Sequence, residues 1–188
     1  MTDRCDLESV ETARLRLRRR RVSDARVLHE LWTERDPRVP AHRRIDADGR
    51  PTEADLAARI LEDDGSRPGL LTVERRDDGE VVGCCGLVRT GVATPREPAL
   101  AFELLRRAQG RGLATEAGEA VVDLAGAAGH DRLWATVWDW NRPSRRVLEK
   151  LGFTESRSEI GVAGARTLVM VRALSPRGPA RQDGPPSR

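Results

Sequence analysis

The chain has 188 residues, of which 38% are hydrophobic, and its 33 basic and 30 acidic residues leave a net charge of +3. This length and composition indicate one globular domain, and the near balance of charge argues against nucleic acid as a partner. The sequence holds no apolar run long enough to cross a bilayer, and its three cysteines are too few for a disulfide framework. We therefore expect a cytoplasmic protein that uses no membrane, no nucleic acid and, because its histidines lack metal-ligand spacing, no metal.

The first half of the chain predicts a strand, two helices and a hairpin. Leucine and arginine alternate over residues 15–18, as in a strand with one buried face. Apolar side chains recur at helical spacing after Ser23 or Asp24, and again after Thr52, and each of these residues can cap a helix. Two strands then flank an Asp-Asp-Gly turn, at residues 69–75 and 80–89.

The second half adds four strands and two helices. Strands are expected at residues 98–106 and 132–138 and, as a last hairpin, at 154–159 and 166–174. One helix follows the glycine loop and ends at Gly129, and a short helix is expected at 145–151. The resulting order, β-α-α-β-β-β-α-β-α-β-β, predicts a mixed α+β fold. We expect a flexible N-terminus over residues 1–11, a folded domain over 12–174, and a disordered tail rich in proline, glycine and arginine over 175–188.

The most informative segment is Gln109-Gly110-Arg111-Gly112, which leads from a predicted strand into a predicted helix. Backbone N–H groups converge at such a helix N-terminus, where the helix dipole favours an anion, and glycine allows a close approach. No lysine follows the glycines, so a Walker A loop is excluded, and the third glycine of a dinucleotide fingerprint is absent. The segment predicts a site for phosphate or pyrophosphate on a nucleotide-bearing cofactor, although ordinary strand-to-helix turns also use glycine.

A second motif lies between residues 139 and 153. Asn141 can cap a short helix, Pro143 is tolerated in its first turn, and Gly152 suits the position after its end. Ser144 precedes apolar residues at positions three, four and seven further on, which places its hydroxyl on the inner face of that helix. The segment therefore predicts a short helix with a polar group turned towards the fold.

The two motifs together resemble the GNAT family of N-acetyltransferases. The family's loop pattern, Gln/Arg-x-x-Gly-x-Gly/Ala, is met by Gln109, Gly112 and Ala114. Its second signature, Asn-x-x-Ser followed by Gly-Phe, is met by Asn141, Ser144, Gly152 and Phe153. The run Ala-Thr-Glu-Ala after the loop and the opening Leu-Arg-Leu-Arg strand resemble the RimJ/RimL-like branch. The resemblance covers about residues 12–174 and implies a mixed, mostly antiparallel sheet of about seven strands with about four helices, in which a splayed strand pair forms the acyl-CoA cleft.

The resemblance implies an enzyme that transfers an acetyl group from acetyl-CoA, or from another short acyl-CoA, to a primary amine. The amine would attack the thioester directly, and the acceptor would be a protein N-terminus or a small molecule. Cofactor contacts are implied for Phe102, Leu104, Leu105, Gln109, Gly110, Arg111, Gly112, Leu113, Ala114, Thr115 and Asn141. A non-catalytic acyl-CoA-binding sensor or interaction module is the alternative, and we expect a monomer or a homodimer.

Two residues are candidates for acid–base chemistry. Glu103 would take a proton from the incoming ammonium, directly or through water, if burial raised its pKa, and a plain exposed strand residue is the alternative. For Ser144 the resemblance implies protonation of the departing CoA thiolate, and a hydroxyl bonded to its own backbone is the alternative. Many GNAT enzymes use a tyrosine a few residues later, but this chain contains no tyrosine.

The acceptor side is less well defined by the sequence. Trp134, Trp138 and Trp140 alternate along and just after a predicted strand, so we expect them to project to one side, as core or as the wall of a flat or apolar acceptor site. Acidic side chains of the charged segment between the first two helices could steer a cationic amine or simply be solvated: Asp46, Asp48, Glu53 and Asp55.

Overall fold

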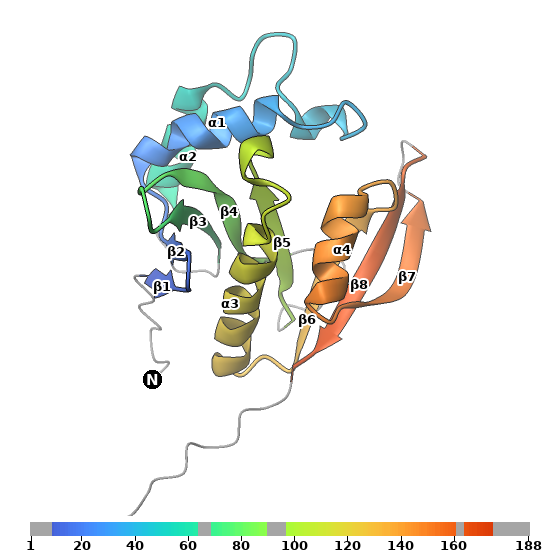
Figure 1. The fold of residues 1–188 in the computed structure, drawn as a ribbon. Helices are drawn as coiled ribbons and strands as arrows, with labels where there is room; N and C mark the ends of the chain where they lie inside the picture. Colours follow the sequence, from blue (N-terminus) through green and yellow to red (C-terminus); the bar gives the residue numbers. More distant parts are fainter. Residues whose placement is uncertain (1–8, 64–68, 90–96, 161–163, 175–188) are drawn as a thin grey trace, which may run out of the picture.

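One eight-stranded sheet organises the protein (Figure 1). The computed structural model describes residues 9–63, 69–89, 97–160 and 164–174. The strands are β1 (Ser9–Glu11), β2 (Leu15–Arg18), β3 (Leu70–Arg75), β4 (Val81–Val88), β5 (Ala99–Leu104), β6 (Arg132–Trp138), β7 (Thr154–Ile160) and β8 (Arg166–Ala173). Their order across the sheet is β1-β2-β3-β4-β5-β6-β8-β7, and every neighbouring pair is antiparallel except β5 and β6, which are parallel.

Helices cover both faces of this sheet. The α-helices of the described residues are α1 (Ala25–Thr33), α2 (Glu53–Glu62), α3 (Leu113–Ala127) and α4 (Arg142–Lys150). On one face, α1 and α2 bury apolar side chains together with Cys84 and Leu105. On the other face, α3 and α4 pack with Cys85 and Leu104 in the larger core, because neighbouring residues of a strand point to opposite faces.

The predicted mixed α+β fold is confirmed, with one strand more than expected. The additional strand is β1, which pairs with β2 and lies in the stretch expected to be a flexible N-terminus. The predicted cap at Asn141 is confirmed, and α4 accordingly begins at Arg142, three residues before the range 145–151 expected for this helix. The expectations for residues 1–8 and for the tail 175–188 lie outside the described residues.

The sheet opens between β5 and β6. Within the described residues these two strands pair at a single position, Ala99 with Trp134, where the Trp134 N–H donates to the Pro98 carbonyl at 3.1 Å. In Figure 1 the two groups of strands meet near the lower end of β5 and diverge towards the top. This is the splayed strand pair that the resemblance implied. Since β5 and β6 are parallel, the segments that follow both strands leave from the open end of the sheet.

A buried ion pair holds the first helix to the sheet. The Arg18 guanidinium donates to both carboxylate oxygens of Asp24 at 2.8 and 3.0 Å, and the Thr72 hydroxyl donates to Asp24 at 2.7 Å. Their side chains are only 7% (Arg18) and 3% (Asp24) exposed. Burial alone would raise the pKa of Asp24, but hydrogen bonds from Arg18, the Arg21 N–H and Thr72 outweigh it, so the pKa lies below its ordinary value of 3.8. The ionised carboxylate is therefore part of the folded state.

We predict that Asp24→Asn lowers the free energy of unfolding by about 2 kcal/mol at neutral pH, because the buried Arg18 loses its bidentate counter-charge and keeps only the Glu74 carboxylate, at 2.7 Å. The pKa of Asp24 is lower in the folded chain, so its contribution is complete above 3.8 and is lost as the pH falls through the folded value. Urea unfolding at several pH values should show the difference between wild type and variant narrowing in acid. A difference that does not change with pH would contradict this.

Strand β4 approaches β5 closely at Gly83. A methyl group on Gly83 would lie 2.2 Å from the Glu103 carbonyl oxygen and 2.8 Å from the Leu104 Cα, both backbone atoms that cannot move aside. Gly83 therefore lets the two strands keep the register that positions Glu103.

We predict that Gly83→Ala destabilises the fold by about 2 kcal/mol or more, because the extra carbon overpacks the contact between the strands. Gly126, within α3, is the matched control, since a methyl group there meets nothing within 4 Å. Gly126→Ala should be neutral or stabilising by up to about 1 kcal/mol. Denaturant unfolding measures both, and equal stability of the two variants would argue against the close approach.

Candidate active site

The loop after β5 has the geometry of an anion site at a helix N-terminus. Gly110 and Gly112 have φ angles of +74° and +79°, a region that other residues rarely adopt, and Gly112 is the N-cap of α3. The N-cap residue is a glycine, so no capping side chain accepts a hydrogen bond from the N–H groups of Leu113, Ala114 and Thr115. These are the donors that a phosphate or pyrophosphate accepts.

Three side chains, those of Gln109, Glu116 and Arg14, hold this loop against the rest of the fold. The Gln109 side-chain amide donates to the Leu104 carbonyl at 2.8 Å. Glu116 accepts hydrogen bonds from the Thr12 hydroxyl (2.5 Å), the Arg14 N–H (2.8 Å) and the Arg14 guanidinium (2.7 Å). Burial raises the pKa of Glu116, but these bonds lower it by more, so its net shift is downward. Arg14 also donates to the Arg111 carbonyl at 3.0 Å, so the loop is fixed before any ligand arrives.

The edge of β5 that faces β6 offers backbone groups. The Leu105 N–H donates to Val82 in β4, and because C=O and N–H of one peptide point in opposite directions, the Leu104 carbonyl faces the opening. The backbone groups of Phe102, two residues earlier in the same strand, point the same way. The side chains of Leu104, Leu105 and the later Leu113 are buried in the core, whereas Phe102 is half-buried. A cofactor in the opening would therefore meet mainly the backbone here.

The second motif lies at the open end of β6. The Asn141 side-chain oxygen accepts from the Ser144 N–H at 3.2 Å, so Asn141 is the N-cap of α4. No hydrogen bond joins its amide nitrogen to another described residue. The half-buried Ser144 hydroxyl also has no hydrogen-bond partner within the described chain, so the alternative of a hydroxyl bonded to its own backbone is not what the structure shows.

Glu103 lies on the opposite face of β5 from Phe102 and Leu104, towards α1. Both of its carboxylate oxygens accept from Arg35, at 2.7 and 2.6 Å, and its side chain is 33% exposed. Arg35 in turn lies over the Trp32 ring, 4.0 Å from its centre. Arg35 therefore fixes the Glu103 side chain at the edge of the opening. Arg35 is 68 residues away in the sequence, and no sequence pattern indicated this contact.

The tryptophans lie at two different places. Trp138 and Trp140 stack with ring centres 5.3 Å apart and an interplanar angle of 5°, although Trp140 lies beyond the end of β6. Trp134 instead donates to Glu97 at 3.0 Å near the start of the strand. Only Trp138 and Trp140, which lie at the open end of the sheet, can form a flat wall beside an acceptor.

The acidic segment between α1 and α2 mostly serves its own loop. Asp46 accepts from the N–H groups of Asp48 and Arg50, and Asp55 forms a capping box with Thr52 at the start of α2. Asp55 also pairs with Arg50. The expectation that these acids steer a cationic amine finds no support in this arrangement.

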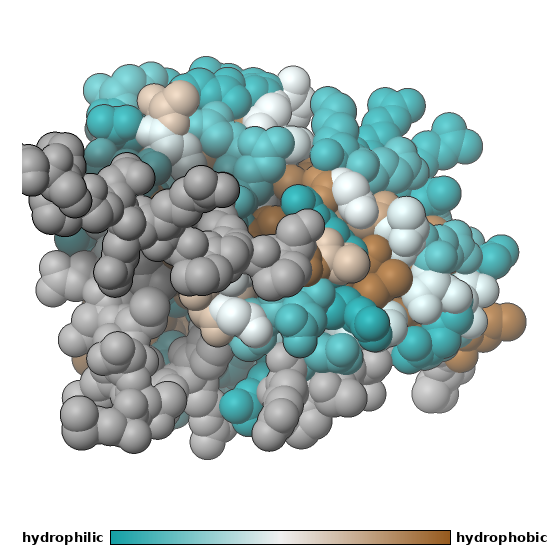
Figure 2. Space-filling view, turned by 90° about the horizontal axis from the view of Figure 1, so that it is seen from below, coloured by the Kyte–Doolittle hydropathy of each residue, from teal (hydrophilic) through white to brown (hydrophobic). Residues whose placement is uncertain are grey.

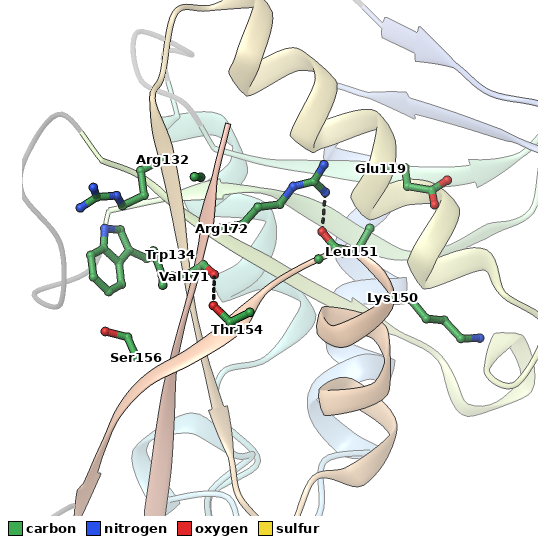
Figure 3. A pocket seen from close by; sticks show the side chains of 11 residues that line it. Glu119, Arg132, Trp134, Lys150, Leu151, Thr154, Ser156, Val171 and Arg172 are labelled. Atoms are coloured by element: carbon green, nitrogen blue, oxygen red, sulfur yellow. Dashed lines mark hydrogen bonds between the residues drawn. The ribbon is translucent and has the colours of Figure 1, made fainter. Parts of the chain in front are cut away.

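A large cavity lies elsewhere. It measures about 710 Å³ and lies at the closed end of the sheet, between Glu119 of α3, Lys150 and Leu151 at the end of α4, and Trp134 (Figure 3). Arg172 donates to the Leu151 carbonyl across it. Seen from this end, the residues that are not drawn in grey are mostly hydrophilic, with apolar side chains gathered near the middle of the view (Figure 2). Of the residues predicted for the site, Trp134 lines this cavity, whereas the residues predicted for catalysis and for cofactor binding do not.

Two further properties constrain the chemistry. Cys84 and Cys85 are buried on opposite faces of β4, and burial raises the pKa of Cys84 to about 11 and that of Cys85 further still. Neither supplies a thiolate nucleophile at neutral pH. Among the described residues no group of His, Cys, Asp or Glu is arranged to hold a metal ion, and no helix is long and apolar enough to cross a membrane.

Comparisons with known proteins agree with this geometry. The family model of the acetyltransferase (GNAT) domain matches residues 14–154. The uncharacterized N-acetyltransferase p20 of Bacillus licheniformis is 28% identical over 78% of this chain and 83% of its own. A GNAT-family acetyltransferase from Bacillus anthracis superposes with a TM-score of 0.72 at 18% identity, over 88% of this chain and 98% of its own. RimJ of Mycobacterium smegmatis, solved with CoA-disulfide, gives a TM-score of 0.66 at 22% identity, over 85% and 81%. The chain therefore belongs to the GNAT family and is an acyl-CoA-dependent acetyltransferase that takes its acetyl group from acetyl-CoA.

Proposed function

We propose that the protein acetylates a primary amine by direct attack of the neutral amine on the thioester of acetyl-CoA. The observation that carries this proposal is the convergence of two helix N-termini, α3 and α4, at the open end of the parted strands β5 and β6. Ligands of open sheets bind beyond the carboxyl ends of such parallel strands. The buried cysteines support direct attack, since an acyl-enzyme on either would need a thiolate that burial disfavours.

The cofactor has a defined path in this proposal. The backbone from Gln109 to Thr115 accepts the pyrophosphate, and Arg111 adds positive charge. The pantetheine arm follows the unpaired edge of β5 and meets the free amide nitrogen of Asn141. Amine and thioester then meet between the strands, and this positioning, with polarisation of the thioester carbonyl by backbone N–H groups, supplies most of the catalysis.

Two side chains take part in proton transfer in this proposal. Ser144 donates a proton to the departing CoA thiolate, and its hydroxyl is available because no described residue engages it. Glu103 receives the proton of the incoming ammonium, directly or through water. Its two oxygens already accept from Arg35, which holds the carboxylate at the edge of the opening and leaves its remaining lone pairs for the amine or a water. The acceptor is a protein N-terminus or a small amine.

We predict that Gly112→Val weakens acetyl-CoA binding at least about tenfold, because valine cannot adopt the left-handed N-cap and the loop N–H groups lose their alignment. Isothermal titration calorimetry measures the effect. The matched control is Gly129→Val at the other end of α3, where φ is also +79° and no atom lies within 4 Å. That variant carries similar strain but should bind acetyl-CoA like wild type. Equal weakening in both would show that only helix stability had been tested.

We predict that Glu103→Gln and Ser144→Ala each slow acetyl transfer by about tenfold or more while acetyl-CoA still binds, because each removes a proton-transfer group. Release of CoA thiol in the presence of primary amines measures the rate. Glu119→Gln, an exposed carboxylate of α3, is the control and should retain full activity. Unchanged rates would remove these roles, and tight acetyl-CoA binding with no amine ever acetylated would favour the acyl-CoA-binding module.

A further inference from the structure

One segment bridges the opening of the sheet on the side of α1. We name residues 35–44 the arginine segment. At one end, Arg35 bonds to Glu103 on β5. Further on, the Arg38 guanidinium lies 4.1 Å from the centre of the Trp140 ring, and that of Arg43 lies 5.4 Å from the centre of the Trp138 ring. The segment thus contacts both halves of the sheet where the cofactor thioester and the amine would meet.

The arginine segment is only partly neutralised. Arg35 is paired with Glu103, and Arg38 is paired with Asp36 through two hydrogen bonds at 2.9 and 2.7 Å. Arg38 lowers the pKa of Asp36 well below its usual range, so that pair is fully ionised. Arg43 and Arg44 have no carboxylate partner within the described chain. Arg43 therefore places a positive charge beside Trp138 with no ion-pair partner among the described residues.

Arg43 is held in place although no carboxylate of the described residues pairs with it. Its carbonyl accepts from the Arg35 guanidinium at 2.6 Å, and its own guanidinium lies over Trp138. The side chain stays accessible to solvent. Partial burial of its guanidinium and the charge of Arg35 lower its pKa, and the opposing effect of the Glu103 charge is smaller. A cation in such a position gains from an anionic partner and offers several N–H donors in a planar fork.

A second donor in the same cluster also lacks an acceptor. The indole N–H of Trp140 is buried, and no hydrogen bond joins it to a described residue. The cluster therefore has donors to spare, whereas its two carboxylates, Asp36 and Glu103, are already bonded to arginines. A bound molecule that supplies oxygen acceptors suits this surplus, and a polycation does not.

We propose that the amine acceptor carries an anionic group, a carboxylate or a phosphate, which the Arg43 guanidinium binds beside the face of Trp138. This inference rests on the proposed amine acetylation and names the class of acceptor. Arg43 acts as a specificity residue that orients the acceptor, and the flat Trp138–Trp140 wall packs against the acceptor's body.

The test compares acceptors that share one skeleton and differ in charge. Release of CoA thiol is measured with the peptide amides Ser-Glu-Ala and Ser-Gln-Ala, with phosphoethanolamine and ethanolamine, and with spermidine. We expect kcat/KM for the anionic member of at least one pair to exceed that of its neutral partner about tenfold, mainly through KM. The pair that shows the preference distinguishes carboxylate from phosphate.

The variants locate the preference. Arg43→Gln keeps the backbone carbonyl that bonds to Arg35 and should reduce the anionic acceptor to the level of its neutral partner. Arg26→Gln is the matched control, since Arg26 is an exposed arginine of α1 outside the arginine segment, and it should keep the preference. Equal use of both members of each pair, preference for spermidine, or a preference that survives Arg43→Gln would overturn the inference while amine acetylation stands. Absence of thiol release with every amine would instead remove the proposed function.

Discussion

The structure depends on the parting of two parallel strands after one point of contact. Strands β5 and β6 pair at Ala99 and Trp134 and then diverge, which leaves backbone groups of β5 without a strand partner. Unpaired backbone groups are costly when they are buried, so such an opening persists only if other groups satisfy or solvate them. The Gln109 side chain satisfies one, the Leu104 carbonyl, and the rest face the space where the cofactor is proposed to lie.

Both sides of this opening are braced by contacts distant in sequence. On the side of α3, Glu116 gathers Thr12 and Arg14 and so holds the glycine loop in place. On the side of α1, Arg35 holds Glu103 and the backbone of Arg43. These contacts hold the glycine loop and Glu103 in place before ligands bind, which reduces the entropy lost on binding. The large cavity at the closed end takes no part in this arrangement.

The two faces of the opening have different chemistry. The α3 side presents uncapped backbone N–H groups, which suit the phosphates of a cofactor. The α1 side presents tryptophans together with more arginines than carboxylates. A reaction between a nucleotide-bearing thioester and an amine uses two such faces, one for each substrate, and Arg43, which no described carboxylate pairs with, favours an acceptor with negative charge.

Local chemistry by itself determined much of this protein. The alternation in β2, the cap at Asn141 and the glycines at 110 and 112 depend on neighbours within a few residues, so the elements, the loop and the family motifs could be predicted from the sequence. Short segments with weak periodicity, such as β1, could not. Tertiary structure alone decided what surrounds the reactive groups. Glu103 meets Arg35 across 68 positions and Glu116 meets Arg14 across 102, and among 33 basic residues no spacing distinguishes these partners. Such pairs form only when the sheet brings distant segments together, because side-chain contacts depend on distance in space and not on distance along the chain.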